Sequence, residues 1–147
     1  MILANTPLLA ALTAWLLAQA IKVPLDYCRT GKWHWHLIVR AGGMPSSHVS
    51  LVASLAWSIG LQNGFQNALF AIAAVAVLIV IYDAAGVRRA AGQHARAINL
   101  FIMDLPLGHP LKQEKLKEVL GHTPNQVASG TVLGVIVAWA MWWWMER

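Results

Sequence analysis

The stretch Gly42-Gly43-Met44-Pro45-Ser46-Ser47-His48 leads into an apolar run of about residues 47 to 62. Proline and serine favour the first turn of a helix, so the run is expected to begin as a helix at this stretch. The chain around it is 58% hydrophobic and 12% charged, with a mean hydropathy of +0.54. About a quarter of the residues are charged in soluble domains, so we expect this helix to lie in a membrane.

Three further apolar runs accompany this one, at about residues 7 to 21, 65 to 82 and 124 to 145. Three of the four runs are shorter than the roughly 20 residues that a perpendicular membrane helix needs, so the boundaries given for these helices are approximate. Trp33 and Trp35 flank one apolar boundary, as aromatic residues at a membrane interface do. No basic segment precedes the first run, so we expect a retained helix rather than a signal peptide.

A polar stretch of about residues 83 to 122 separates the last two runs. Apolar residues recur there at helical spacing, which predicts an amphipathic helix over residues 84–104, on the membrane surface or packed partly into the bundle. Lys112 to Leu120 is expected to be a short charged helix. The predicted fold class is all-α: a polytopic membrane helix bundle of about four spans plus an amphipathic interfacial helix, in one domain over residues 1–147. With Cys28 as the single cysteine, an internal disulfide is excluded.

The charges are distributed unevenly along the chain. If the four predicted spans all cross the membrane, ten of the eleven basic residues lie on one side of it and Arg147 lies on the other. The positive-inside rule then predicts an inner-membrane protein with this side in the cytoplasm and both termini outside. Nucleic acid is not an expected partner, because no soluble aromatic platform accompanies the cations. The ten residues are Lys22, Arg29, Lys32, Arg40, Arg88, Arg89, Arg96, Lys112, Lys115 and Lys117.

Pro45-Ser46-Ser47-His48 has the features of an anion site. The free N–H groups and the positive dipole end of the helix face the polar interface at this point. Ser46 and Ser47 add hydroxyl donors, and Gly43 allows a close approach of the backbone. The alternative is an ordinary serine cap beside an interfacial histidine.

Gly121-His122-Thr123-Pro124 repeats the arrangement where the last apolar run begins. A single histidine at such a position is more often a capping or interfacial residue than a catalyst. His48 and His122 are expected on the same face of the membrane, each beside glycine and proline. The pair, rather than either histidine alone, indicates a reactive site.

These residues resemble the type 2 phosphatidic acid phosphatase superfamily, which also contains the vanadium haloperoxidases, and in particular its small divergent membrane branch. The superfamily motifs are K-x6-R-P, P-S-G-H and S-R-x5-H-x3-D. Pro45-Ser46-Ser47-His48 is similar to the second motif, and the segment from His122 to Gly130 is similar to the end of the third. The arginine of the third motif would lie in the run from Tyr82 to Arg89. Lys22 and Arg29 have the spacing of the first motif, with Arg40 as a rival arginine.

The resemblance implies a two-step phosphatase that needs no metal and no cofactor. His122 would attack phosphorus, and His48 would protonate the leaving alcohol and then activate water. Arg88, or Arg89, would stabilise the charge on the phosphoryl oxygens. His34 and His36 alternate with tryptophan and indicate an interfacial belt better than a metal site. The phosphate-binding residues implied are Lys22, Gly43, Ser46, Ser47 and Arg89.

Gln126 stands where the superfamily has an aspartate. That aspartate orients the nucleophilic histidine, and a glutamine can accept its N–H without adding negative charge. Asp83 could supply the missing carboxylate, or it could pair with Arg88 or Arg89. Gln126 and Asp83 are therefore the two candidate orienting residues.

The expected function is hydrolysis of a lipid phosphate or pyrophosphate monoester taken from the bilayer. An alternative is a catalytically inactive relative that binds anionic lipid headgroups or scaffolds a partner. A vanadate-dependent use of the pocket is a further alternative, which the hydrophobicity of the chain disfavours. Gly130, Gly134 and Ala138 form a ridge of small residues that serves either packing within the bundle or a homodimer seam.

Overall fold

The computed structural model describes residues 5–38, 43–106, 109–113, 116, 118 and 121–145. All of its regular structure is helical over these residues, which confirms the predicted all-α membrane bundle. The elements in chain order are α1 (Thr6–Thr30), η2 (Trp35–Ile38), α2 (Ser47–Asn63), α3 (Ala68–Tyr82), η3 (Asp83–Val87), α4 (Arg88–Met103), η4 (Pro110–Gln113) and α5 (Pro124–Met145).

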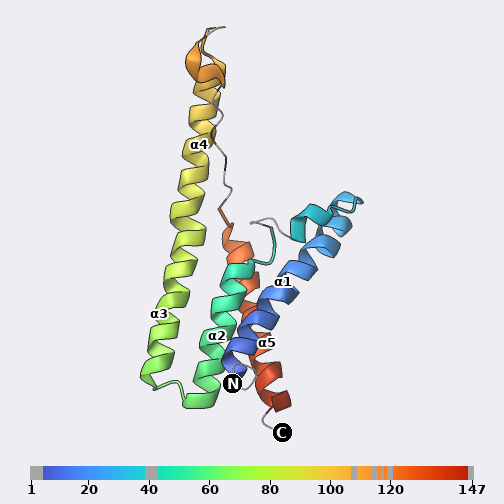
Figure 1. Cartoon of the computed structure of the whole chain (residues 1–147), viewed down its shortest axis with the longest axis vertical. Helices are drawn as coiled ribbons and strands as arrows, with labels where there is room; N and C mark the ends of the chain where they lie inside the picture. The colour runs from blue at the N-terminus through green and yellow to red at the C-terminus, as the bar shows by residue number, and fades with distance from the viewer. Residues whose placement is uncertain are drawn as a thin grey trace.

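The helices α1, α2 and α5 pack together, and α3 lies beside α2 (Figure 1). Both termini lie at the same end of the bundle, so the segments that join α1 to α2 and α4 to α5 share the opposite end. Among the described residues, three helical stretches are long and apolar enough to cross a membrane: Thr6–Cys28, Ala68–Met103 and Pro124–Met145. At 17 residues, or about 26 Å, α2 is shorter and lies between its neighbours.

The limits of the helices follow from local capping. Asn5 accepts a hydrogen bond from the backbone N–H of Leu8 and begins α1, and Ser46 caps α2 in the same way. Gly31, at φ 67°, ends α1 in the left-handed conformation that glycine favours. Since no such terminator comes earlier, α1 runs nine residues beyond the predicted limit at residue 21, and Lys22 lies inside the helix.

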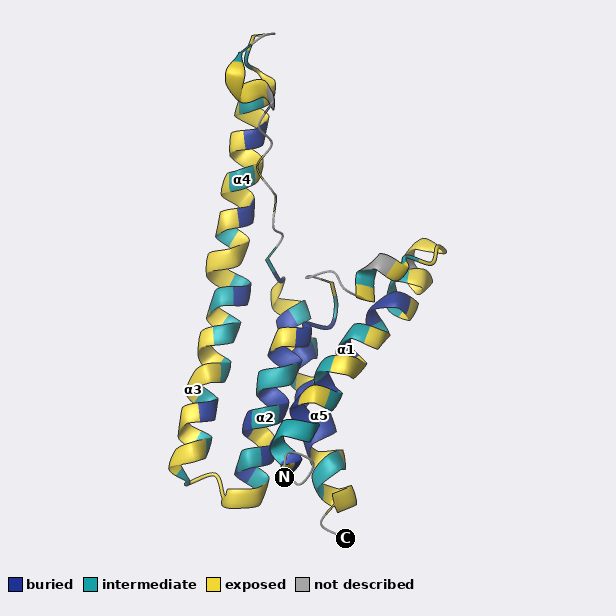
Figure 2. Ribbon diagram, in the orientation of Figure 1, coloured by how far each residue is buried: buried dark blue, intermediate teal, exposed yellow. Residues whose placement is uncertain are grey.

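Small residues line the contact between α1 and α2. On α1 a stripe repeats every fourth residue and on α2 a second stripe does the same, and every member is at most 5% exposed. In Figure 2 the buried residues accordingly face inwards where α1, α2 and α5 meet. The hydroxyl of Ser50 donates to the Ala14 carbonyl across this contact at 3.3 Å. The α1 stripe is Thr6, Ala10, Ala14, Ala18 and Lys22, and the α2 stripe is Ser46, Ser50, Ser54 and Ser58.

Glycines on α5 bring that helix into backbone contact with α2. A Cβ atom on Gly130 would lie 2.6 Å from the Ser46 carbonyl oxygen, and one on Gly134 would lie 2.5 Å from the Ser50 carbonyl oxygen. Such distances are below van der Waals contact, so only glycine fits. Of the two roles considered for the Gly130, Gly134 and Ala138 ridge, the structure supports packing within the bundle.

The expected amphipathic helix is present as α4, and it continues α3 in nearly the same direction instead of turning across it (Figure 1). A single π-helical turn, η3, joins the two. The chain then returns along α4, where the Asn99 side chain binds both the N–H and the C=O of Leu116 at 2.9 Å. The helix predicted over Lys112 to Leu120 is wrong at Leu116 and Glu118, which are not helical. Asn99 provides the hydrogen bonds that a helix would otherwise give Leu116.

Gly134→Ala is expected to lower the free energy of unfolding by about 1–3 kcal/mol, because its methyl group would overlap the α2 backbone. Gly86→Ala is the matched control, since its methyl group would meet no atom within 4 Å. Thermal unfolding in detergent, followed by tryptophan fluorescence, measures both. Equal midpoints for the two variants would contradict the packing described for α2 and α5.

Candidate functional site

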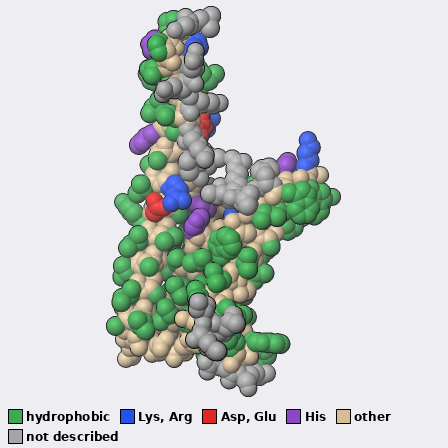
Figure 3. Space-filling model, in the orientation of Figure 1, with side chains coloured by type: hydrophobic (Ala, Val, Ile, Leu, Met, Phe, Trp, Pro, Cys, Tyr) green, Lys and Arg blue, Asp and Glu red, His purple; other side chains and the backbone are tan. Residues whose placement is uncertain are grey.

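Residues from three parts of the chain surround a cavity of about 150 Å³ at the end of the bundle where α2 begins. Its lining divides into a polar side and an apolar side. Figure 3 shows histidine, basic and acidic side chains gathered on the visible face at this level. The polar residues are His48, Asp83, Arg88 and His122, and the others are Leu51, Val52, Val80 and Ala84.

Lys22 is the basic end of the small-residue stripe on α1. It is 3% exposed, because the fourfold spacing that buries Ala14 and Ala18 also directs this side chain towards α2. Its ammonium group donates to Ser47 Oγ at 3.3 Å and to Gln19 Oε1. Gly43, at φ 84°, leaves room beside the lysine stem. The site therefore holds a buried cation at the N-terminal end of α2.

The N-terminal ends of α2 and α5 are tied to each other. The N–H of Ser46 donates to the Gln126 carbonyl at 3.0 Å, and the hydroxyl oxygen of Ser46 accepts from Val49 N at 3.5 Å. Ser46 and Ser47 are both buried, at 0% and 2% exposure. Two helix N-termini, each with a positive dipole end, thus lie next to each other and to Lys22.

His122 is 3% exposed and lies just before α5. Its backbone N–H donates to the Ala84 carbonyl at 2.9 Å, which fixes the residue against η3. Within the described part of the chain, neither ring nitrogen of His122 has a hydrogen-bond partner. A buried imidazole with two unused nitrogens is costly for folding, so it is a candidate for a ligand contact.

Burial is the main cause that lowers the pKa of His122 below its usual value of about 6.5. The positive charges of Lys22, His48 and Arg88 lower this pKa further. Both effects favour the neutral imidazole, which is the form that can act as a nucleophile.

The two candidate orienting residues are engaged elsewhere. Gln126 Oε1 accepts a hydrogen bond from the backbone N–H of Thr123 at 3.0 Å. This bond is one of the two that make up a helix capping box. Asp83 Oδ2 accepts from Arg88 Nη2 at 2.8 Å. Of the two roles considered for Asp83, the structure shows the pairing with arginine.

The other predicted residues separate into two groups. Arg88 reaches the cavity, whereas Arg89 is exposed and contributes its backbone, against which Gly121 packs. The side chain of Arg29 and the whole of Arg40 lie outside the described residues. The sequence analysis did not predict the apolar wall, although Leu51 and Val52 follow His48 by one helical turn and Val80 precedes Asp83 by one.

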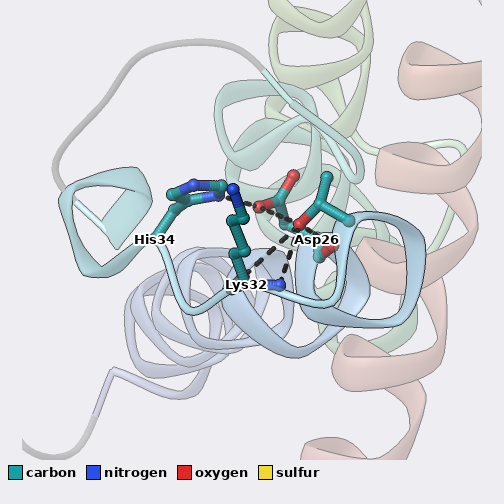
Figure 4. Close-up of polar contacts among 4 residues, drawn as sticks. Asp26, Lys32 and His34 are labelled. Atoms are coloured by element: carbon teal, nitrogen blue, oxygen red, sulfur yellow. Dashed lines mark hydrogen bonds and ion pairs between the residues drawn. The ribbon is translucent and has the colours of Figure 1, made fainter.

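His34 forms a separate cluster at the end of α1. Its Nδ1 atom lies 2.6 Å from Asp26 Oδ2, and Figure 4 shows the imidazole facing that carboxylate beside Lys32. The neighbouring rings of Tyr27 and Trp33 are stacked with centroids 4.4 Å apart. Across the residues that the structure describes, no group of three or more His, Cys, Asp or Glu side chains is placed to hold a metal ion.

Comparison with known proteins assigns the family. The sequence profile of the Divergent PAP2 family matches residues 3–137. The chain belongs to this family. The membrane protein YuiD of Bacillus subtilis (strain 168) is 39% identical in an alignment 147 positions long, which covers 92% of this chain and 93% of that protein. No solved structure gives a significant match.

The cavity thus combines the parts that phosphoryl transfer requires. It is lined by the buried His122 imidazole, by His48 at the N-terminal end of α2 and by one cation, Arg88. Lys22 does not line the cavity, but its charge acts on His122. Anions bind well at such a helix end, and preorganised cations stabilise the charge of a phosphoryl group.

His122 is expected to titrate below pH 6.5, and Lys22→Met should raise its midpoint, because loss of a nearby cation makes the imidazolium less unfavourable. The midpoint should remain below 6.5, since the ring stays buried. NMR of 13C-histidine-labelled protein measures the titration, with the signal assigned through His122→Ala. The control is Lys32→Met, which removes an exposed lysine. A wild-type midpoint at or above 6.5 would contradict this electrostatic description.

Proposed function

We propose that this protein is a membrane phosphatase that hydrolyses a lipid phosphate or pyrophosphate monoester through a phosphohistidine intermediate. The observation that carries the proposal is the convergence of His122 and His48 on one cavity with Arg88. The family assignment supports a fold related to phosphatidic acid phosphatases. We further propose that this face is cytoplasmic, since Lys22, Arg88 and Arg89 lie at this end of the bundle and basic residues favour the cytoplasmic side.

In the first step, the unprotonated ring nitrogen of His122 attacks phosphorus. The bond between phosphorus and the leaving oxygen breaks, and protonated His48 gives its proton to that oxygen. In the second step, neutral His48 takes a proton from water as the water attacks phosphorus. The P–N bond breaks, inorganic phosphate leaves, and both histidines return to their starting forms.

The surrounding groups favour negative charge at the phosphoryl oxygens. Lys22 and Arg88 supply two positive charges, and the α2 N-terminus supplies a partial one. At 150 Å³ the cavity is below the roughly 300 Å³ of a pocket that encloses a drug-sized ligand, so it fits a headgroup and leaves the tail outside. Leu51, Val52 and Val80 give the tail an apolar wall one turn deeper in the membrane.

A second candidate function is the binding of anionic lipid headgroups without turnover. The observation that favours it is the unpartnered His122 ring, to which Gln126 gives no hydrogen bond. In other histidine-dependent enzymes, replacing the orienting carboxylate by an amide lowers the rate by about 10,000-fold. This candidate predicts phosphate binding in the absence of hydrolysis.

Turnover separates the two candidates. Purified protein in detergent is expected to release phosphate from a panel of phosphatidic acid, phosphatidylglycerophosphate and isoprenyl diphosphate. His122→Ala should lower the rate by at least about 1,000-fold, because it removes the nucleophile. His94→Ala is the matched control, since His94 is exposed on α4 and does not line the cavity.

His48→Ala tests the second step. With 32P-labelled p-nitrophenyl phosphate, whose leaving group needs little protonation, this variant should form the phosphohistidine and hydrolyse it slowly. Acid-labile 32P bound to the protein should therefore accumulate in His48→Ala and be absent from the double variant with His122→Ala. Equal background release from wild type and all variants, with no labelled protein, would contradict the phosphatase proposal.

A further inference from the structure

The π turn η3 interrupts an otherwise continuous helix from Ala68 to Met103. At this turn the N–H of Arg88 donates to the carbonyl of Asp83, five residues earlier, where an α-helix would use a residue four earlier. Single π turns within α-helices are rare and are found frequently at functional sites. Here the turn lies beside the cavity, to which it contributes Asp83 and Ala84.

The turn changes the rotational phase of the helix. Successive residues of an α-helix are rotated by about 100°, so residues five apart point about 140° away from each other. Asp83 and Arg88 are five apart, yet Asp83 Oδ2 and Arg88 Nη2 are 2.8 Å apart and both side chains line the cavity. A regular α-helix through this segment would direct Arg88 away from Asp83. The extra residue of the π turn thus places the arginine on the cavity.

The π turn and the start of α4 also hold the chain that carries His122. The Ala84 carbonyl accepts the backbone N–H of His122 at 2.9 Å. Gly121 packs so closely on the helix that a Cβ atom there would lie 2.3 Å from the backbone nitrogen of Arg89. Arg88 and His122, which are far apart in the sequence, are therefore both positioned by η3 and the start of α4.

We propose that the π turn Asp83–Val87 is the positioning element of the site, in which Asp83 holds the Arg88 guanidinium on the cavity while Ala84 anchors His122. This inference rests on the proposed function for its catalytic consequence. A guanidinium has five N–H donors, so Asp83 can orient Arg88 and leave other donors for a phosphate. Asp83 acts through Arg88 and is a positioning residue.

A carboxylate in an anion-binding cavity has two opposite effects. Asp83 orients the cation, which favours turnover, and its own charge repels a bound phosphate, which weakens binding. Asp83→Asn should therefore bind inorganic phosphate several-fold more tightly and yet turn over about 100-fold more slowly. A decrease of about 100-fold is the effect on turnover of losing one oriented hydrogen-bond donor. A residue with a merely structural role would not move these two quantities in opposite directions.

Insertion of one alanine between Gly86 and Val87 tests the phase directly. It places Asp83 and Arg88 six positions apart, which rotates Arg88 by about 100° away from Asp83 and shifts the contacts of His122. We expect loss of inorganic phosphate binding and a fall in turnover of at least about 100-fold. Gly86→Ala keeps the number of residues, meets no atom within 4 Å, and should behave as wild type.

Inorganic phosphate binding by calorimetry and lipid phosphate turnover are measured for wild type and the three variants, with thermal unfolding to confirm that each is folded. Unchanged binding and turnover in Asp83→Asn overturn the inference, even where the insertion variant fails to fold. Equal values for the insertion variant and Gly86→Ala overturn it as well. A wild type that binds phosphate without hydrolysing it contradicts the proposed function alone, and the shifts in phosphate affinity then decide the inference. A wild type that neither binds nor hydrolyses contradicts both.

Discussion

Close contact of α2 with α1 and α5 is the constraint on which the rest of the structure depends. Gly130 and Gly134 bring α5 onto the carbonyl groups of α2, and alanines such as Ala14 on α1 approach it from the other side. In a membrane, where lipid is as apolar as the side chains, such contacts replace the hydrophobic effect as the source of helix association. The same contacts set the depth and rotation of the helices, so that Lys22 and the starts of α2 and α5 reach one level.

The groups at this level are unfavourable for folding. Three features cost free energy in an apolar bundle: a buried ammonium group, an imidazole with no hydrogen-bond partner among the described residues, and a serine-lined α2. Ser47 and Gln19 offset part of the cost for Lys22. Proteins depart from the rules of good packing mainly at functional sites. A phosphate bound as we propose would favour the charge of the ammonium group and give the imidazole a partner, whereas Ser54 and Ser58 lie further along α2, away from the cavity.

Much of this arrangement could be predicted from the sequence. The apolar runs identified the four long helices of the bundle, and the serine and proline signals located the beginnings of α2 and α5 within one or two residues. Thr123 and Gln126 have the spacing of a capping box, so the hydrogen bond from Thr123 to the Gln126 side chain could have been predicted as well. The π turn could not be predicted, because no residue pattern distinguishes a backbone hydrogen bond that spans five residues from one that spans four. Whether Arg88 or Arg89 reaches the site depends on that turn, and the choice therefore required the structure.

The most direct test of the account is an experimental structure of the protein with vanadate, which imitates a phosphoryl group during transfer. We expect vanadate in the cavity, bonded to a ring nitrogen of His122, within hydrogen-bonding distance of Arg88 and next to His48, with Lys22 at the N-terminal end of α2. Vanadate bound elsewhere, or a His122 ring turned away from an empty cavity at saturating vanadate, would contradict the central claim that the close helix packing builds a phosphate site.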